Sequence, residues 1–170
     1  MALDAQDGME IHREADGGYR LVARQRLSRP LEEVFPYFAE PRNLEQLTPP
    51  LLRFEVRTPG PLTMGTGLMI DYRLRLHGVP LRWQSEITAY EPGRRFVDEQ
   101  RRGPYRYWIH EHGFAEQDGL TEVEDLVRYR PPGGRLLHDW FVAPDLRRIF
   151  AYRRRVLAQR FGEAPPAAAG

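Results

Sequence analysis

The sequence predicts an α+β fold: a curved antiparallel β-sheet of about six to seven strands covered by one long C-terminal α-helix, with two short helices after the first strand. Between residues 54 and 129 apolar and polar residues alternate with a period of two, which is typical of strands with one buried face. Tight turns separate these segments, and sequential strands joined by tight turns form an antiparallel meander. Only the end of the chain shows helical spacing over a length that can cover such a sheet.

The first elements are a strand and two short helices. Residues 19–27 alternate as a strand does. Ser28 predicts a helix N-cap with Pro30 in the first turn, and apolar residues then recur at helical spacing over residues 31–38. A second helical turn over residues 42–47 ends before two consecutive prolines.

The meander follows these helices. Gly, Pro and Asp-rich turn signals lie between its segments, among them Glu91-Pro92-Gly93 and Asp118-Gly119. Because each segment is short and each connection tight, neighbours in the chain should pair as neighbours in the sheet. The predicted strands cover residues 54–56, 67–77, 81–90, 94–101, 108–114 and 120–129.

A helix over most of residues 136–161 ends the domain, interrupted or restarted at Pro144. We predict a polar N-terminal lead-in over residues 1–18, a single domain over 19–162 and a flexible tail over 163–170. Five arginines of this helix should lie mostly outside its apolar stripe, on a solvated face: Arg147, Arg148, Arg154, Arg155 and Arg160. Its apolar stripe consists of Leu146, Ile149, Phe150, Leu157 and Phe161.

The composition excludes several function classes. The chain has no cysteine and no lysine, which removes disulfides, thiolate chemistry and Schiff-base lysines. The formal net charge of +1 gives no reason to expect nucleic acid or an anionic membrane as partner. No signal peptide or apolar run of membrane-spanning length is present, so we expect a cytoplasmic protein without integral membrane association.

Several motifs carry a family resemblance that covers roughly residues 19–161. The chain resembles the START-like, or Bet v 1-like, SRPBCC superfamily, which includes polyketide cyclase/dehydrase and coenzyme Q-binding proteins. It is most similar to a bacterial branch of ligand-binding SRPBCC proteins. The motifs are Leu27-Ser28-Arg29-Pro30-Leu31-Glu32-Glu33-Val34-Phe35, Asn43-Leu44-Glu45-Gln46-Leu47-Thr48-Pro49, Ile87-Thr88-Ala89-Tyr90-Glu91-Pro92-Gly93-Arg94-Arg95-Phe96, and Gly103-Pro104-Tyr105 before Trp108-Ile109-His110-Glu111-His112.

This resemblance implies a helix-grip fold, in which the sheet wraps the C-terminal helix and leaves an apolar cavity between them. Members of the superfamily hold lipids, sterols, quinones, polyketides or plant hormones there, and a minority catalyse cyclisation or dehydration. As a rule the resemblance implies no metal, and we predict no cofactor. Fold alone does not decide between carriage and catalysis.

Strand parity predicts which side chains face the cavity. Trp108 and Phe114 share a strand face with His110 and His112, where a core strand would normally carry aliphatic residues. A mostly apolar concavity with a few convergent polar groups is the usual form of a small-molecule site. The predicted ligand-binding residues are Tyr72, Trp83, Ser85, Phe96, Asp98, Gln100, Trp108, His110, His112, Phe114, Asp125 and Tyr129.

The polar members of this set have alternative interpretations. Asp98 and His110 can satisfy each other across adjacent strands instead of contacting a ligand. Asp125 can cap a loop. Two histidines two apart on a strand can also reach one metal ion, with an aspartate as third ligand, but an isolated His-x-His is a weak signal and we predict no metal site.

Three functions follow from these observations. The favoured one is binding of a hydrophobic small molecule, such as a lipid, polyketide, quinone or other cyclic or aromatic compound. The alternative is a cofactor-independent cyclase, aromatase or dehydratase, with His110 as general acid or base oriented by Asp98 and with His112 or Ser85 holding the substrate oxygen. The third is a protein–protein interaction module with a closed cavity. A homodimer is possible in each case.

Overall fold

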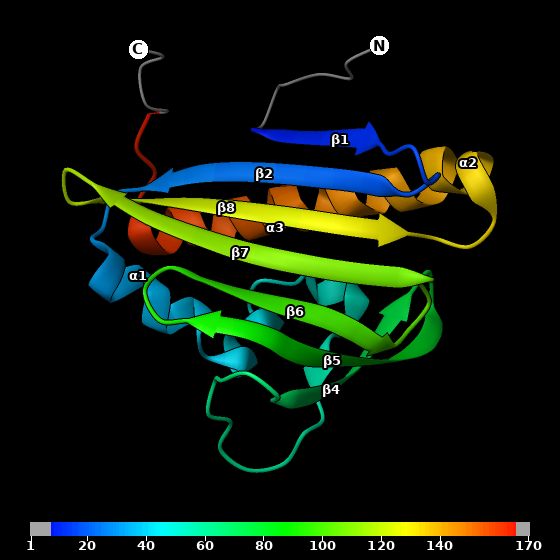
Figure 1. Ribbon diagram of the computed structural model, residues 1–170, viewed down its shortest axis with the longest axis horizontal. Helices are drawn as coiled ribbons and strands as arrows, with labels where there is room; N and C mark the ends of the chain where they lie inside the picture. Colours follow the sequence, from blue (N-terminus) through cyan, green and yellow to red (C-terminus); the bar gives the residue numbers. More distant parts are fainter. Residues whose placement is uncertain (1–7, 166–170) are drawn as a thin grey trace.

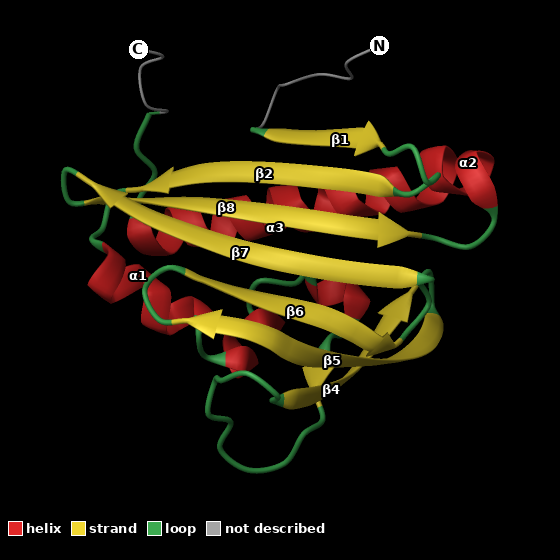
Figure 2. Cartoon of the chain, viewed as in Figure 1, coloured by secondary structure: helices red, strands yellow, loops and turns green. Residues whose placement is uncertain are grey.

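Eight antiparallel strands form one sheet that curves around the C-terminal helix (Figures 1 and 2). The computed structural model describes residues 8–165. The strand order is β1-β2-β8-β7-β6-β5-β4-β3, so β3 to β8 form a meander in chain order and the β1–β2 hairpin pairs along β8. The predicted α+β helix-grip fold is confirmed, with one strand more than the upper end of the predicted number.

The strands are β1 (Met9–Arg13), β2 (Tyr19–Leu27), β3 (Glu55–Val56), β4 (Met69–Leu76), β5 (Val79–Glu91), β6 (Arg95–Arg102), β7 (Tyr107–Gln117) and β8 (Leu120–Arg130). The helices are α1 (Leu31–Phe38), the 3₁₀ turns η1 (Pro41–Glu45) and η2 (Pro50–Leu52), α2 (Gly134–Leu137), the π-helical turn η3 (His138–Val142) and α3 (Ala143–Phe161). Every helix within this part of the chain is too short or too polar to cross a membrane.

Residues near both predicted domain limits pair with the sheet. The polar lead-in contains β1, which pairs with β2 and places Met9 in the core opposite Ala23. Only Met9 and Ile11 of that strand are apolar, so its alternation was too short to see. At the other end, Glu163 bridges to Leu27, and residues 1–7 and 166–170 of the predicted lead-in and tail lie outside the described residues.

The N-cap of helix α1 lies two residues later in the chain than predicted. Pro30 occupies the N-cap position, and Ser28 instead donates its backbone N–H to the carbonyl of Gly162 at 3.2 Å. The Glu116 carboxylate accepts from the N–H of Leu31 at 2.6 Å, which satisfies one of the unpaired donors at the helix start. This bond ties the helix to the end of β7.

Two-residue turns set the register of the meander. His77 and Gly78 connect β4 to β5 with φ of 50° and 83°, and Asp118 and Gly119 connect β7 to β8 with φ of 56° and 72°. Such left-handed pairs match the twist of the strands that they join. The predicted turn at residues 77–80 is therefore shorter than expected, because β5 already begins at Val79.

Buried side chains gather at the two ends of the sheet and along its far edge. Leu27, Phe35 and Phe114 belong to a cluster where α1 and the end of α3 meet the sheet. Tyr19, Tyr129 and Leu146 belong to a second cluster at the start of α3. Between the clusters α3 lies behind the sheet (Figure 1), and this is where a cavity remains.

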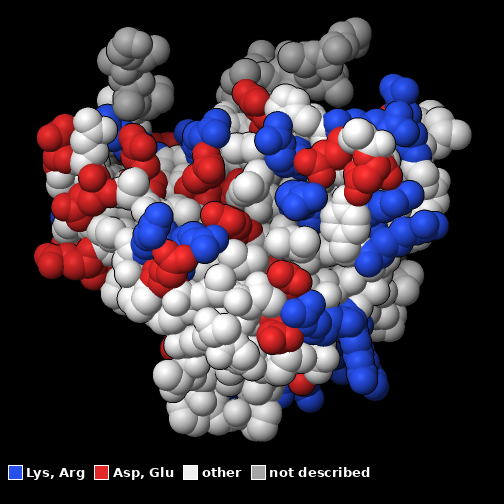
Figure 3. Space-filling model, in the orientation of Figure 1, with Lys and Arg blue, Asp and Glu red and all other residues white. Residues whose placement is uncertain are grey.

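The outer face of the sheet carries charges of both signs. Figure 3 shows basic and acidic side chains interspersed over this face. Many form cross-strand pairs, such as Arg24 with Glu124 at 2.5 Å and Arg101 with Glu86 at 2.7 Å. No single-sign field develops over these strands, in agreement with the low net charge.

We expect Leu27→Ala to lower the free energy of unfolding by about 2–5 kcal/mol. The Leu27 side chain is fully buried, so its truncation would leave a cavity between α1, α3 and the sheet. Urea unfolding followed by circular dichroism measures this change. Val79→Ala at the exposed β4–β5 turn is the control and should stay within about 0.5 kcal/mol of the wild type. Equal effects of the two substitutions would contradict the described core.

Candidate functional site

A cavity of about 490 Å³ lies between the inner face of the sheet and α3. Its walls come from β4, β5, β6 and β7 on one side and from α1, η1, η2 and α3 on the other. Most of the lining is aliphatic or aromatic. This volume and lining fall in the range of small-molecule sites.

Strand parity placed most of the predicted residues correctly. Along β4 and β5, every second side chain from Ile70 to Ile87 faces the cavity, as alternation predicts. Two irregularities in the pairing of β5 with β6 do not change this. Eight of the twelve predicted residues line the cavity: Tyr72, Trp83, Ser85, Phe96, Asp98, Trp108, His110 and His112. Four do not: Gln100, Phe114, Asp125 and Tyr129.

Gln100 closes the loop between β6 and β7. Its side chain donates to the carbonyl of Tyr105 at 2.7 Å and accepts from the Tyr105 N–H at 3.3 Å. A Cβ on Gly103 would lie 2.2 Å from the Gln100 side-chain oxygen, so glycine is required where the loop passes over it. Strand alternation predicts the correct face for Gln100. Its side chain, however, forms hydrogen bonds with the loop that follows β6 and not with the cavity.

Phe114 and Tyr129 are core residues. Phe114 packs edge-on against Phe35 and Phe38, with ring centroids 5.1 and 5.0 Å apart, and so fills the end of the grip beneath α1. The Tyr129 hydroxyl forms a hydrogen bond of 2.9 Å with the ring nitrogen Nε2 of His138. Both side chains face inward as strand alternation predicts. Residues of α1 pack over Phe114 and His138 of η3 packs over Tyr129, so neither side chain lines the cavity.

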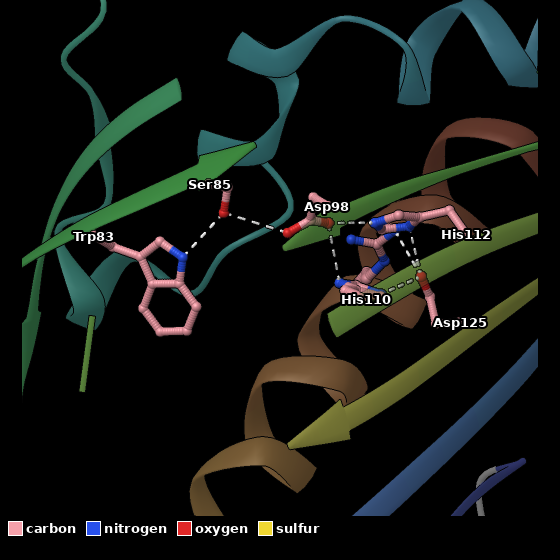
Figure 4. Close-up of polar contacts among 7 residues, drawn as sticks. Trp83, Ser85, Asp98, His110, His112 and Asp125 are labelled. Carbon is pink, nitrogen blue, oxygen red and sulfur yellow. Dashed lines mark hydrogen bonds and ion pairs between the residues drawn. The ribbon is translucent and has the colours of Figure 1, made fainter. Parts of the chain in front are cut away.

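A chain of polar side chains crosses the apolar interior (Figure 4). The Trp83 indole N–H donates to Ser85 Oγ at 3.0 Å, and the Ser85 hydroxyl reaches Asp98 Oδ1 at 3.4 Å. Asp98 Oδ2 lies 3.1 Å from His112 Nε2 and 3.7 Å from His110 Nδ1. The predicted Asp98–His110 proximity is present, but the closer partner of Asp98 is His112.

Asp125 lies behind the two histidines and joins them. Its Oδ1 is 2.9 Å from His110 Nε2, 2.8 Å from His112 Nδ1 and 3.2 Å from Arg153 Nη2. The residue caps no loop, contrary to one interpretation of the sequence, and reaches the cavity only through residues that line it, the two histidines and Arg153. We refer to Asp98, His110, His112, Asp125 and Arg153 as the polar cluster.

The surrounding residues shift the pKa values of His110 and His112 in opposite directions. Burial disfavours a charge on His112, but hydrogen bonds with Asp125 and Asp98 outweigh it and raise the pKa of this imidazole. Burial and the neighbouring His112 lower the pKa of His110, whose ring centroid is only 3.7 Å away. Because the two imidazoles lie this close, a charge on one disfavours a charge on the other, and the opposite pKa shifts favour the proton on His112.

The carboxylates remain ionised in this surrounding. Burial would raise the pKa of Asp125, but the charge of Arg153 and hydrogen bonds from both histidines hold it well below its usual range. Burial would likewise raise the pKa of Asp98, but the hydrogen bond from His112 and the positive charges of His112 and Arg153 outweigh burial and lower it. With His110 neutral, the two carboxylates balance the charges of His112 and Arg153.

Arg153 is the main polar residue that the sequence analysis missed. It is only 5% exposed, and the sequence prediction had assigned it neither to the apolar stripe nor to the solvated arginines. Its position is three residues after Phe150 and four before Leu157, which is the spacing of the buried stripe. Continuing the stripe through residue 153 would have placed an arginine opposite the predicted inward histidines.

An aromatic wall was also missed in part. Tyr105 lines the cavity beside the predicted Trp83 and Trp108, with ring centroids 5.6 Å from Trp83 and 4.9 Å from Trp108. Trp83 and Trp108 meet nearly edge to face at 5.4 Å. Tyr105 lies in the loop before β7, where no strand parity applies, so only the family motif pointed to it.

The cavity reaches the surface beside the β4–β5 turn. Phe141 of η3 lines the cavity and is 52% exposed. His77 Nε2 at the turn forms a 2.7 Å hydrogen bond with the carboxylate of Asp145 at the start of α3, and its ring meets Phe141 edge-on. Side chains from the turn and from η3 therefore form the rim of an entrance.

The comparisons with known proteins agree with this architecture. The family model described as "Polyketide cyclase / dehydrase and lipid transport" matches residues 27–153, which is more than two thirds of the chain. The chain belongs to this family. The match extends from the end of β2 to Arg153, so it includes every residue of the polar cluster. No curated protein matches the chain.

Solved structures similar to this member of the polyketide cyclase/dehydrase family share its fold at low identity. Protein Ms6760 from Mycobacterium smegmatis is 17% identical with a TM-score of 0.63, over 94% of this chain and 99% of that one. The Zhui aromatase/cyclase from Streptomyces sp. R1128 is 13% identical with a TM-score of 0.64, over 83% and 92%. Ginseng major latex-like protein 151 from Panax ginseng is 9% identical with a TM-score of 0.64, over 85% and 98%. The START-like SRPBCC resemblance is thus confirmed.

We expect Arg153→Met to lower the free energy of unfolding at pH 7 by about 3–5 kcal/mol, because Asp125 then lies buried without its arginine. Urea unfolding measures the change. Arg148→Met on the exposed face of the same helix is the matched control and should change stability by at most about 0.5 kcal/mol. A tolerated Arg153→Met substitution would show that the polar cluster does not need this charge.

Proposed function

We propose that the protein binds a hydrophobic small molecule, such as a lipid, polyketide, quinone or other cyclic or aromatic compound, in the cavity between the sheet and α3. The observation that carries this proposal is the cavity of about 490 Å³ with its apolar lining and a single polar cluster. Burial of apolar ligand surface contributes about 25 cal/mol per Å². An open cavity does not suit the alternative of an interaction module with a closed one.

The lining supports a ligand with one flat apolar part and one polar end. Trp83, Tyr105 and Trp108 present ring faces and edges on one wall, and aromatic pairs favour offset-stacked or edge-to-face contacts. Asp98, His110 and His112 line the same cavity and offer both donors and acceptors to a hydroxyl, carbonyl or carboxylate. The polar cluster would then fix the orientation of the ligand.

We expect the naphthoquinone menadione to quench the fluorescence of Trp83 and Trp108 saturably in a Trp140→Phe background. Both tryptophans line the cavity, whereas Trp140 is 75% exposed. Leu81→Phe projects extra volume from β5 into the cavity and should weaken binding by about 1–3 kcal/mol. Val79→Phe, on the same strand but outside the lining, is the control.

Oleic acid in the same titration distinguishes a preference for flat rings from a general affinity for apolar chains. Binding of neither probe, or equal effects of Leu81→Phe and Val79→Phe, would reject this cavity as the binding site.

A second candidate function is cofactor-independent cyclisation or dehydration, and the His110–Asp125 hydrogen bond favours it. The 2.9 Å bond from Nε2 to Asp125 fixes the ring and leaves Nδ1 as an acceptor at the cavity. Nδ1 could take a proton from the methylene between two carbonyls of a poly-β-ketone, and the resulting enolate carbon would attack a second carbonyl. Returning that proton to the alkoxide formed by the attack would give a β-hydroxyl. Nδ1 would then take a second α-proton and deliver it to the departing hydroxyl, which leaves as water while a C=C bond forms, so no oxidant or reductant is needed.

We expect His110→Gln to abolish aromatisation of a poly-β-ketone thioester while menadione binding changes by less than about threefold, since glutamine fills similar space without a basic nitrogen. Appearance of the aromatic product is followed by absorbance. His77→Gln, which removes a histidine at the rim of the same cavity, serves as control. Turnover that survives His110→Gln, or its absence in the wild type, would leave ligand binding as the only function of the cavity.

A further inference from the structure

We infer that Asp98, His110 and His112 form a binding site for one divalent transition-metal ion. One ligand atom from each of the three residues lies within 4.8 Å of the other two. Asp98 Oδ2 is 3.1 Å from His112 Nε2 and 3.7 Å from His110 Nδ1. Ligand atoms around a tetrahedral zinc ion are about 3.3 Å apart, so one of these two distances is slightly shorter and the other slightly longer than zinc binding requires.

The arrangement of the outer atoms is the strongest argument for this site. His110 Nε2 and His112 Nδ1, which point away from the shared centre, lie 2.9 and 2.8 Å from Asp125 Oδ1. The outer oxygen of Asp98 meets the Ser85 hydroxyl, which Trp83 holds in turn. Metal-binding histidines and carboxylates are usually oriented by such partners on their second atom.

The donor set indicates which ions would bind. Two imidazoles and one carboxylate suit zinc, iron, copper or nickel, whereas magnesium and calcium prefer oxygen ligands alone. With both histidines neutral, Asp98 and Asp125 outweigh Arg153 by one negative charge, so a divalent ion would leave the polar cluster with a net charge of +1.

The site would face the ligand cavity. All three proposed metal ligands line that cavity, so coordination positions left open by the protein would be reached from the apolar side. Two histidines and a carboxylate leave at least one position for a water or a ligand oxygen. The ion would bind an oxygen-bearing ligand such as an enolate or carboxylate, whose negative charge the site would then balance. This inference stands independently of the proposed carrier function.

Chelator-treated protein titrated with Zn²⁺ in a calorimeter tests the inference. We expect one ion per chain, with Asp98→Asn and His112→Gln each weakening binding at least 100-fold and Asp125→Asn weakening it about 10–100-fold. His77→Gln is the matched control, because it removes another His–Asp pair at the same cavity and should leave the affinity unchanged. His12→Ala in every variant removes the exposed His12–Glu10 pair as a background site.

Visible absorption of the Co²⁺-loaded wild type gives a second readout that needs no variant at the site. Intense d–d bands of a nitrogen- and oxygen-ligated tetrahedral or five-coordinate ion support the site, and the weak spectrum of hydrated Co²⁺ overturns it. Zn²⁺ binding that is absent, or that Asp98→Asn and His112→Gln leave intact, also overturns it. Menadione binding is measured on the metal-free protein, so failure of the metal site and failure of the carrier function are seen separately.

Discussion

Charge balance around Asp125 is the constraint on which the interior depends. Its carboxylate oxygen Oδ1 lies within 3.2 Å of His110, His112 and Arg153, and all four side chains are buried. An unpaired charge there would be far more costly than a solvated one. Strands β7 and β8 and helix α3 must therefore keep their relative positions for these four residues to remain satisfied, and this couples the helix to the sheet across the grip.

The same constraint divides the cavity into an apolar part and a polar part. Donors and acceptors are concentrated where β6 and β7 face Arg153, while the aromatic wall and the aliphatic residues of β4 fill the remainder. A ligand with one polar end has one favourable orientation in such a space. Carriage and catalysis share this requirement, because both depend on where the first oxygen atom of the ligand lies.

The sequence predicted the sheet and most of the site because strand parity is a strict period. Trp83, Asp98 and His112 follow from alternation alone, since each shares its strand face with an apolar neighbour, namely Leu81, Phe96 and Phe114. Gln100 was misplaced because strand ends also need hydrogen bonds for their turns. Arg153 was missed because a charged side chain is not expected in the apolar stripe, although its spacing places it there. Its burial is explained by its partner Asp125 on a strand that is distant in the sequence.

What occupies the space between Asp98, His110 and His112 would decide which partner a ligand oxygen meets. A proton on His112 leaves His110 Nδ1 as an acceptor for a ligand hydroxyl or for a proton in the proposed catalysis. A metal ion bound as inferred above would use the lone pairs of both imidazoles and present an electrophile instead. Under either proposal the polar cluster, rather than the apolar walls, would determine how the ligand oxygen is held.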